Sequence, residues 1–369
     1  MKVVFLLTQD RGGPADLTVS LAEEVSGRAG GPQVTIVGPA SLSETVRLKG
    51  LLQPIHVQSK TDLRGFRAAA ALLAKLAPDI IHAQDRRAGL VSSLVARKKT
   101  PVVLTFHGVP DNAAGRWVKA GPLLGRHPGV SGGSRLIADA LLARRMECTV
   151  APSQAMAAFL RRELRVPPDR LRVVPNGVTI PPRSQQVQGI RTFATVSSFA
   201  PCKATPALVE AFLSVASTRS GLRLRLVGDG PDRPRCQELA QQAPRGGNVE
   251  FTGYRTDVAA QLAQADVFVL PSLNENLPLA LLQAMAMGLP CIAADVGGIS
   301  EVLDADSGIL VTPGDVGSLC AAMERMIDEP GLAATLGVMA RRRVAERFTL
   351  SRCADGYLQL WSEILGGRR

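Results

Sequence analysis

The chain has 369 residues, of which 46% are apolar, and its formal net charge at pH 7 is +11. This length suggests two domains of ordinary size, and the apolar fraction can give each of them a full core. No run approaches the ~20 apolar residues of a membrane span, and 4% aromatic residues without a recognisable RNA- or DNA-reading module argue against a nucleic-acid partner.

The first half of the chain alternates short apolar runs with helical patterns. The runs that we interpret as strands are residues 3–7, 34–37, 55–57, 80–82, 102–106 and 149–151. The helical patterns fall near residues 15–28, 64–76, 87–98, 134–145 and 153–165. The first run is too short for a signal-peptide core and polar residues follow it, so we expect a strand there. Alternation of this kind predicts a parallel sheet covered by helices on both faces.

A linker and a second sheet are expected in the other half. Residues 179–189 are rich in Pro, Ser and Gln, which is typical of a linker. Beyond them the same rhythm predicts strands at residues 195–197, 224–227, 249–252, 267–270, 291–294 and 308–311. The terminal segment 350–365 is predicted to form one long helix. The fold class that follows is α/β, with two Rossmann-like domains.

The most informative stretch of the sequence is residues 271–303. It follows an apolar run whose hydrogen-bond ladder Pro271 should stop. Residues 279–287 are apolar nearly all round, which predicts a buried helix, and the Gly-Leu-Pro turn at 288–290 should end it. Glu275 lies between strand and helix. Because ligands of open α/β sheets bind beyond the carboxyl ends of strands, we expect this carboxylate at a ligand site.

This stretch resembles the donor-binding signature of the retaining GT-B glycosyltransferases of family 4. That signature has two glutamates separated by seven residues, then an Ala-Met-Ala-x-Gly-x-Pro helix end and a Gly-Gly-x-x-Glu loop. The chain keeps the first glutamate as Glu275 and carries Gln283 where the second is expected. The resemblance implies that the first carboxylate binds donor-sugar hydroxyls and the second binds the ribose diol. A glutamine amide still forms hydrogen bonds there, but without the charge-assisted one.

Three further motifs resemble the same family in the expected order. Thr105-Phe106-His107-Gly108 matches its Thr-x-His strand end, residues 173–178 resemble the segment before its linker, and residues 227–231 contain its Gly-Asp-Gly-Pro turn. Each motif is weak alone, but together they cover the chain from end to end.

The resemblance implies the GT-B fold, in which two Rossmann-like domains have parallel sheets facing across a cleft. The N-terminal, acceptor-binding domain is expected at residues 1–185. The C-terminal, nucleotide-sugar-binding domain is expected at residues 186–349. The helix within residues 350–369 should cross back and pack on the first domain.

A nucleotide diphosphate needs cations and backbone N–H donors where charge develops on the leaving group. The family supplies an arginine and, five residues later, a lysine from one loop. Residues 196–203 resemble this loop and retain Lys203, with Ser198 in place of the arginine. Gly12 and Gly13 precede a predicted helix and offer a second anion cradle. The alternatives are a solvated lysine and a simple tight turn.

Two histidines follow or end buried strands. The resemblance implies that His107 hydrogen-bonds the donor sugar, whereas His82, at a similar strand end, suits a structural role. The expected donor-binding set joins side chains and backbone N–H groups, with Pro278 unable to donate. Its members are Gly12, Gly13, Ser198, Lys203, Glu275, Asn276, Leu277, Leu279 and Gln283.

No metal and no other cofactor is expected. Asp304-Ala305-Asp306 imitates the Asp-x-Asp motif of metal-dependent transferases, but acidic residues are ordinary in a polar loop of this kind. The family generally works without a bound metal ion. The six cysteines form no Cys-x-x-Cys and lie in apolar segments, which is typical of the reduced thiols of a cytoplasmic protein.

The basic surplus belongs entirely to the first half of the chain. Residues 1–185 carry 26 Lys and Arg against 13 Asp and Glu, and residues 186–369 carry 17 against 19. In the family this half holds the acceptor, so the surplus suggests an anionic acceptor or peripheral association with an anionic inner membrane face. Solvated helix ends are the alternative. The clusters are Arg64/Arg67, Arg86/Arg87, Arg97-Lys98-Lys99, Arg144-Arg145 and Arg161-Arg162/Arg165.

The function expected is retaining transfer of a sugar from a nucleotide-diphosphate-sugar to an acceptor hydroxyl, with Lys203, Glu275 and His107 as catalytic residues. Two other interpretations stay open. A catalytically eroded module could bind a sugar nucleotide or a partner, which the departures from the motifs would suit, or a GT-B-shaped epimerase could convert a sugar nucleotide without an acceptor.

Loops 39–66 and 108–135 should shape the acceptor pocket. Trp117, with Arg116 and Lys119, marks the second loop as a candidate membrane or acceptor flap. A phospholipid, a polyprenyl-linked intermediate and a natural-product core are all compatible acceptors.

Overall fold

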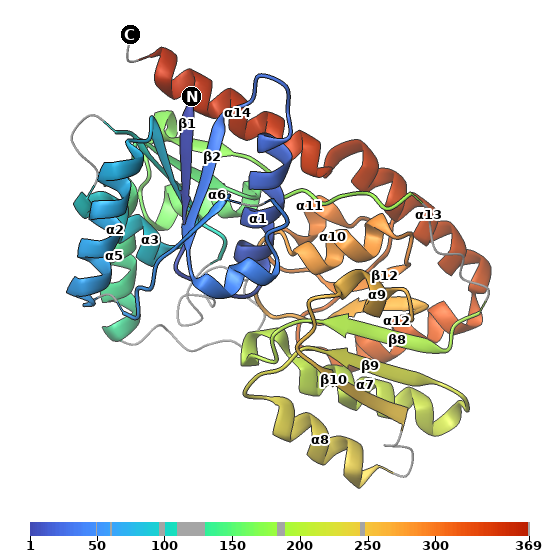
Figure 1. Ribbon diagram of the computed structural model, residues 1–369. Helices are drawn as coiled ribbons and strands as arrows, with labels where there is room; N and C mark the ends of the chain where they lie inside the picture. Colours follow the sequence, from blue (N-terminus) through green and yellow to red (C-terminus); the bar gives the residue numbers. More distant parts are fainter. Residues whose placement is uncertain are drawn as a thin grey trace. The chain divides into compact units, whose positions relative to one another are not determined.

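The computed structural model describes residues 1–48, 50–59, 61–95, 100–108, 130–182, 189–243 and 248–367. These residues form two compact units (Figure 1). One unit holds the described residues up to Gly177 together with those from Leu350 onward, and the other holds those from Val178 to Thr349. Outside the described residues lie part of the predicted linker, residues 109–129 of the predicted flap with Arg116, Trp117 and Lys119, and the whole Arg97-Lys98-Lys99 cluster.

The described part of the first unit contains a seven-stranded parallel sheet in the order β3-β2-β1-β4-β5-β6-β7. Its strands are β1 (Lys2–Leu6), β2 (Gln33–Gly38), β3 (Leu52–Pro54), β4 (Ile80–Ala83), β5 (Val102–Thr105), β6 (Cys148–Ala151) and β7 (Leu171–Val173). The central strands β4, β5 and β6 are buried along their whole length, as their apolar runs predict.

Two differences from the predicted strands occur at the edges of this sheet. The run at 55–57 was expected as a strand, but the ladder with β2 lies three residues earlier, at Leu52–Pro54. Because β2 ends at Gly38, the ladder stops there, and Ile55 closes it with a bond from its N–H to the Gly38 carbonyl, at 2.7 Å. The short edge strand β7 was not predicted, since three residues carry little periodicity.

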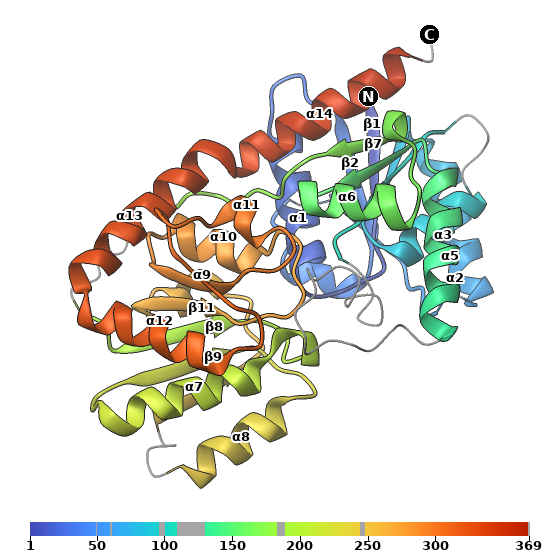
Figure 2. The same cartoon turned by 180° about the vertical axis from the view of Figure 1, so that it is seen from behind.

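Helices cover both faces of the first sheet. They are α1 (Gly13–Ser26), α2 (Leu63–Leu76), α3 (Arg86–Val95), α5 (Val130–Arg145), α6 (Gln154–Glu163) and α14 (Leu350–Gly366), with 3-10 turns η1 (Ala40–Glu44) and η3 (Pro168–Arg170). Helices α2, α3 and α5 lie side by side (Figures 1 and 2).

Helix α14 comes last in the chain but belongs to the first unit, where it lies beside α1 (Figures 1 and 2). Just after α1, Arg28 donates to the Ser351 carbonyl at 2.9 Å and pairs with Asp355. Deeper down, the fully buried Trp361 meets the ring of Phe5 edge-on, 5.6 Å away. These contacts fasten the C-terminal helix to the first strand and first helix.

The described part of the second unit contains a six-stranded parallel sheet in the order β10-β9-β8-β11-β12-β13. Its strands are β8 (Thr192–Val196), β9 (Arg223–Val227), β10 (Val249–Gly253), β11 (Val267–Leu270), β12 (Cys291–Ala294) and β13 (Ile309–Val311). Strand β8 begins three residues before the predicted 195–197, because the buried residues from Thr192 onward already pair with β9. The prediction of two parallel α/β sheets is confirmed.

Helices surround the second sheet as well. They are α7 (Thr205–Thr218), α8 (Arg233–Gln242), α9 (Val258–Leu262), α10 (Leu279–Ala286), α11 (Ile299–Val302), α12 (Val316–Asp328) and α13 (Pro330–Arg347), with the 3-10 turn η4 (Pro201–Lys203). Helix α7 packs beside α12, and α10 packs beside α13 (Figures 1 and 2). No helix in the described part of the chain is long and apolar enough to cross a membrane.

Candidate functional site

Each sheet reverses its strand order once, between β1 and β4 in the first unit and between β8 and β11 in the second. Loops beyond the carboxyl ends of the strands that flank such a reversal are the usual ligand sites of α/β sheets. Lys203 follows β8 and Glu275 follows β11. Gly12 follows β1, and His107 follows β5, which is the neighbour of β4. The predicted residues of each unit therefore gather at its point of reversal.

Lys203 and Glu275 form an ion pair in the second unit. The Nζ atom of Lys203 donates to Oε1 of Glu275 at 2.5 Å, and Ser272 Oγ donates to the same oxygen at 2.9 Å. The Glu275 side chain is 8% exposed and that of Lys203 22%. A backbone bond from Leu273 N to the Cys202 carbonyl, at 2.7 Å, ties the two loops together. A cation and a carboxylate 72 residues apart thus share one site.

The loop that carries Lys203 is a tight 3-10 turn. Lys203 N donates to the Ala200 carbonyl at 2.8 Å, and Ala204 adopts a left-handed conformation with φ 48° before α7 begins. Ser198 lies in the same loop with an exposed side chain. Its hydroxyl offers one donor in place of the bidentate guanidinium of the related loops.

The Gly-Asp-Gly turn after β9 packs directly on this loop. Ser197 N donates to the Val227 carbonyl and Phe199 N to the Asp229 carbonyl, at 3.0 and 2.9 Å. A Cβ atom on Gly228 would lie 1.8 Å from the Ser197 carbonyl oxygen, and one on Gly230 would lie 2.8 Å from the Phe199 backbone. Both positions therefore require glycine for the two loops to meet.

The segment after Glu275 leads into α10. Asn276 and Leu277 are buried, and α10 begins at Leu279 with its first N–H groups at the carboxyl edge of the sheet. The helix ends at Ala286, one residue before the predicted end, and Gly288 takes φ 83° after it. Gln283 lies on α10 and is half-buried.

In the first unit, Gly12 caps α1. Its φ of 88° lies in the left-handed region, and its carbonyl accepts from Ala15 N and Asp16 N at 2.9 and 3.1 Å. Gly13 is the first residue of the helix, and Pro14 follows in the first turn, where a missing N–H costs nothing. A Cβ atom on Gly12 would meet no atom within 4 Å, and the anion cradle at this turn stays a prediction.

His107 is held by a residue that sequence reasoning missed. Its Nε2 lies 2.9 Å from Oε1 of Gln84, the residue that follows β4. Burial lowers the pKa of His107 to about 4, so its imidazole is neutral at pH 7. Gln84 offered no signal in the sequence, because an isolated glutamine after a strand matches no motif.

His82 has a structural position in β4. Its Nε2 bonds Thr105 Oγ1 at 2.8 Å, and its ring packs against Phe5, Tyr357 and Trp361. Burial is the main cause that lowers its pKa to about 3. The residue anchors the sheet to α14 and has no exposed surface.

A cavity of about 240 Å³ opens at the carboxyl ends of β1, β4 and β5. It is lined by Gln9, Pro14, Gln84, Asp85, Arg86, Thr105, Phe106, His107 and Gly108. The structure therefore places the helix turn that Gly12 caps and the His107 side chain around one hollow.

Asp85 and Arg86 brace this cavity. Asp85 accepts from Thr8 Oγ1 at 2.9 Å and caps α3 through Ala88 N at 2.8 Å. Arg86 pairs with the buried Asp139 at 2.9 Å and donates to the Gly108 carbonyl at 2.7 Å. Arg86 thus holds the strand end that carries His107, and Asp85 holds the residues that follow β1.

The basic clusters differ in exposure. The Arg86/Arg87 cluster was expected on a basic surface, but Arg86 is ion-paired and Arg87 donates to the Val57 carbonyl at 2.8 Å. Both guanidinium groups therefore bond acceptors within the first unit. The arginines of the first unit that are exposed include Arg64, Arg67, Arg144, Arg145, Arg161, Arg162 and Arg165.

Asp304, in the Asp-Ala-Asp sequence at 304–306, has a structural role in its own loop. Asp304 pairs with Arg343 of α13 and accepts from Ser307 Oγ at 2.6 Å, so it closes the loop before β13. Within the described ranges no group of three or more His, Cys, Asp or Glu side chains is arranged to hold a metal ion. The six cysteines all lie within these ranges and form no disulfide.

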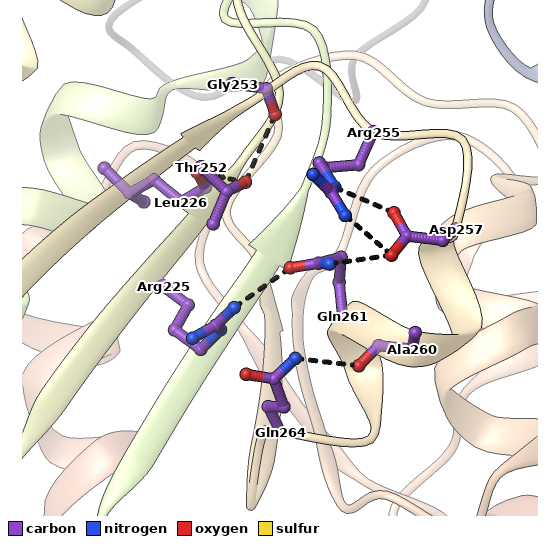
Figure 3. A network of polar contacts seen from close by, with 9 residues as sticks. All are labelled: Arg225, Leu226, Thr252, Gly253, Arg255, Asp257, Ala260, Gln261 and Gln264. Atoms are coloured by element: carbon purple, nitrogen blue, oxygen red, sulfur yellow. Dashed lines mark hydrogen bonds and ion pairs between the residues drawn. The ribbon is translucent and has the colours of Figure 1, made fainter.

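A polar network fixes the loop after β10 (Figure 3). Arg225 of β9 donates to Gln261 at 2.9 Å, Gln261 donates to Asp257 at 3.1 Å, and Arg255 binds Asp257 through two bonds of 2.8 Å. The bonds from Arg255 are the largest cause that lowers the pKa of Asp257 to about 2. Short α9 and the carboxyl end of β10 are thereby locked to β9.

Comparison with known proteins assigns the two halves separately. Residues 11–180 match the model of Glycosyltransferase Family 4, and residues 190–329 match that of Glycosyl transferases group 1. A D-inositol 3-phosphate glycosyltransferase of Saccharomonospora viridis is 30% identical in an alignment of length 325 that covers 79% of this chain and 71% of the relative.

Another relative matches a shorter part. An N-acetyl-alpha-D-glucosaminyl L-malate synthase of Bacillus anthracis is 33% identical over 171 residues, 46% of this chain, and the match spans less than half of its own length, 45%. Among solved structures, Anabaena HepE in complex with UDP-glucose superimposes with a TM-score of 0.80 at 20% identity, covering 100% of both chains.

Proposed function

Because this chain belongs to the group 1 glycosyltransferases of family 4 and has their GT-B fold, we propose that it moves a sugar from a nucleotide-diphosphate-sugar to an acceptor hydroxyl with retention of anomeric configuration. The observation that carries this proposal is the Lys203–Glu275 pair at the reversal of the second sheet. It joins a cation suited to a diphosphate with a carboxylate suited to sugar hydroxyls. The HepE structure that resembles this chain holds UDP-glucose.

Lys203 would stabilise the departing diphosphate. An ammonium group has three donors, so Nζ can keep Glu275 and still bind a phosphate oxygen. Negative charge on that oxygen grows as the bond to the sugar breaks, so this contact is strongest in the transition state. The N–H groups of Asn276, Leu277 and Leu279 are the further donors proposed in the second unit, and the Gly12–Gly13 turn is proposed separately as an anion cradle of the first unit.

Glu275 would bind the sugar rather than attack it. Its Oε1 already accepts from Lys203 and Ser272, which favours a fixed hydrogen-bond acceptor over a mobile nucleophile. The leaving phosphate would take the proton of the incoming hydroxyl as an oxocarbenium-like centre forms. Exclusion of water would protect this centre from hydrolysis. We propose that the reaction needs no metal ion, since Lys203 and backbone donors supply the positive charge.

The acceptor is proposed to be anionic, or presented on an anionic membrane surface. The exposed arginines of the first unit, Arg64 and Arg67 on α2 and Arg144 and Arg145 on α5 among them, support this part of the proposal.

Thermal unfolding with UDP, GDP, ADP and dTDP tests the donor site. A nucleotide present at ~100 times its Kd should add ~2.7 kcal/mol and raise Tm by a few degrees. We expect one nucleotide to stabilise the wild type and to lose this effect in Lys203→Ala. Turnover of that variant should fall about a hundredfold, the scale of one lost transition-state donor.

Lys75→Ala is the matched control, because Lys75 is an exposed lysine on α2 of the other unit. The quantity compared between variants is the change in Tm on adding nucleotide. The Tm without nucleotide is unsuitable, because Lys203→Ala leaves Glu275 without its cation and lowers Tm by itself. Absence of any shift in the wild type would favour the catalytically eroded module, which Ser198 and Gln283 motivate. Conversion of a sugar nucleotide without an acceptor would instead indicate the epimerase.

A further inference from the structure

Gln84 lines the cavity of the first unit and is almost fully buried. Its side chain has a hydrogen-bonding group that is open among the described residues. The residue is 2% exposed, and its backbone N–H bonds the Leu6 carbonyl at 2.9 Å. Its side-chain Oε1 lies 2.9 Å from His107 Nε2, while its Nε2 has no partner among the described residues. Buried amide nitrogens are nearly always bonded, so an open one that lines a cavity is a candidate donor to a molecule bound in that cavity.

The bond between Gln84 and His107 also determines which ring nitrogen carries the proton. An amide oxygen only accepts, so the Nε2 of His107 must donate. The charged residues that line the same cavity are engaged elsewhere: Asp85 binds Thr8 and Ala88, and Arg86 pairs with Asp139. His82, which titrates on the neighbouring strand, bonds Thr105.

We propose that Gln84 is a sugar-binding residue that also positions His107. Its Oε1 holds the imidazole in the Nε2–H tautomer, and its amide nitrogen donates to a hydroxyl oxygen of a substrate sugar in the cavity of the first unit. This proposal rests on the proposed function and adds to it a residue that lies outside the motifs described above. A neutral amide N–H suits a hydroxyl oxygen, because its hydrogen bond is directional and because it carries no net charge that would attract free anions.

Nitrogen-15 NMR of the histidine rings tests the positioning role without any ligand. With four histidines in the chain, His107 can be assigned by its loss in His107→Gln. We expect the Nε2–H tautomer in the wild type and a shift toward Nδ1–H in Gln84→Met, which keeps length but removes the acceptor. In Gln84→Glu a carboxylate faces the ring, and the pKa of His107 should rise by about 1 to 3 pH units.

Gln264→Ala is the matched control, because Gln264 is a glutamine of the second unit that bonds only the Ala260 carbonyl among the contacts drawn in Figure 3. It should leave the His107 signals unchanged. If both Gln84 variants keep the wild-type tautomer and pKa of His107, the positioning role is wrong. The two variants replace the amide in different ways, so the test survives if one of them fails to fold.

Calorimetric titration tests the sugar contact. The nucleotide that stabilises the wild type is compared with its sugar conjugate, as UDP with UDP-glucose or GDP with GDP-mannose. The affinity gained from the sugar is the ratio of the Kd of the bare nucleotide to the Kd of its sugar conjugate. In Gln84→Met we expect this ratio to fall about 3- to 10-fold, with the Kd of the bare nucleotide unchanged.

An unchanged gain from the sugar would overturn the binding role of Gln84. So would a wild type that binds nucleotide and nucleotide sugar equally well. A wild type that binds neither would contradict the proposed function itself, and the NMR measurement would still decide whether Gln84 positions His107.

Discussion

Lys203 and Glu275 bring a positive and a negative side chain into direct contact at one point of the second unit. A partly buried ion pair contributes little net stability, because desolvation offsets most of the attraction. The pair is therefore not needed as a staple of the fold, which agrees with the binding role that we propose for it. Ser198 and Gln283, in contrast, each replace a charged side chain by a neutral one that still forms hydrogen bonds.

His82 makes a residue-scale prediction about pH. Its pKa is about 3 in the folded chain and 6.5 for an ordinary histidine, so the unfolded chain takes up the proton first as the pH falls. The contribution of His82 is fully present above about pH 6.5 and is lost between there and pH 3. Between pH 7.5 and pH 5 the free energy of unfolding should drop by about 2 kcal/mol on this account.

Urea unfolding at both pH values measures this drop. His82→Gln keeps a group that can bond Thr105 but cannot titrate, so its drop should be smaller by that amount. His56→Gln removes an exposed histidine and should behave like the wild type. Equal drops in the wild type and His82→Gln would contradict the assignment of this pKa.

At the scale of elements, the site of the second unit depends on two loops that meet through their backbones. The turn at Gly228 and Gly230 approaches Ser197 and Phe199 so closely that no side chain fits between them. The loop that carries Lys203 is then tied onward to the loop of Glu275. Sequence reasoning located each loop by its motif, but the close approach that makes both glycines necessary depends on how β8 and β9 pair.

Gly230→Ala tests this contact between loops. The new Cβ would lie 2.8 Å from the Phe199 backbone at a φ of 157°, so we expect a loss of about 1 to 3 kcal/mol in the free energy of unfolding and weaker nucleotide binding. Gly331→Ala in α13 has no atom within 4 Å of the new Cβ and should not lower stability. Similar stability of both variants in urea titrations would refute the steric argument.

At the scale of the whole molecule, the chain is organised as two α/β units, with the last helix in the first of them. Trp361 joins α14 to β1, and Tyr357 bonds Thr105 at 3.2 Å, so residues from both ends of the chain share one core. The first unit consists of described residues up to Gly177 and of the C-terminal segment that contains α14. Its stability should therefore depend on this segment.

Trp361→Ala tests this dependence. Removing the fully buried indole should lower the free energy of unfolding by about 3 to 5 kcal/mol, as measured by urea titration. The neighbouring Ser362→Ala, at an exposed position of the same helix, should change it little. A cost below about 1 kcal/mol for Trp361→Ala would mean that α14 contributes little to the core of the first unit.

Local patterns in the sequence were enough to establish the two parallel sheets, most of the helices and the family, because strand runs, helical periods and motifs are all properties of short segments. These patterns misplaced β3 and missed β7, where pairing with a neighbouring strand sets the ends of a short edge strand. The folded chain was needed to find that Lys203 bonds Glu275, that Arg86 pairs with Asp139, and that Gln84 holds His107. These contacts join residues far apart in the chain, and only the packing of strands side by side brings their ends together.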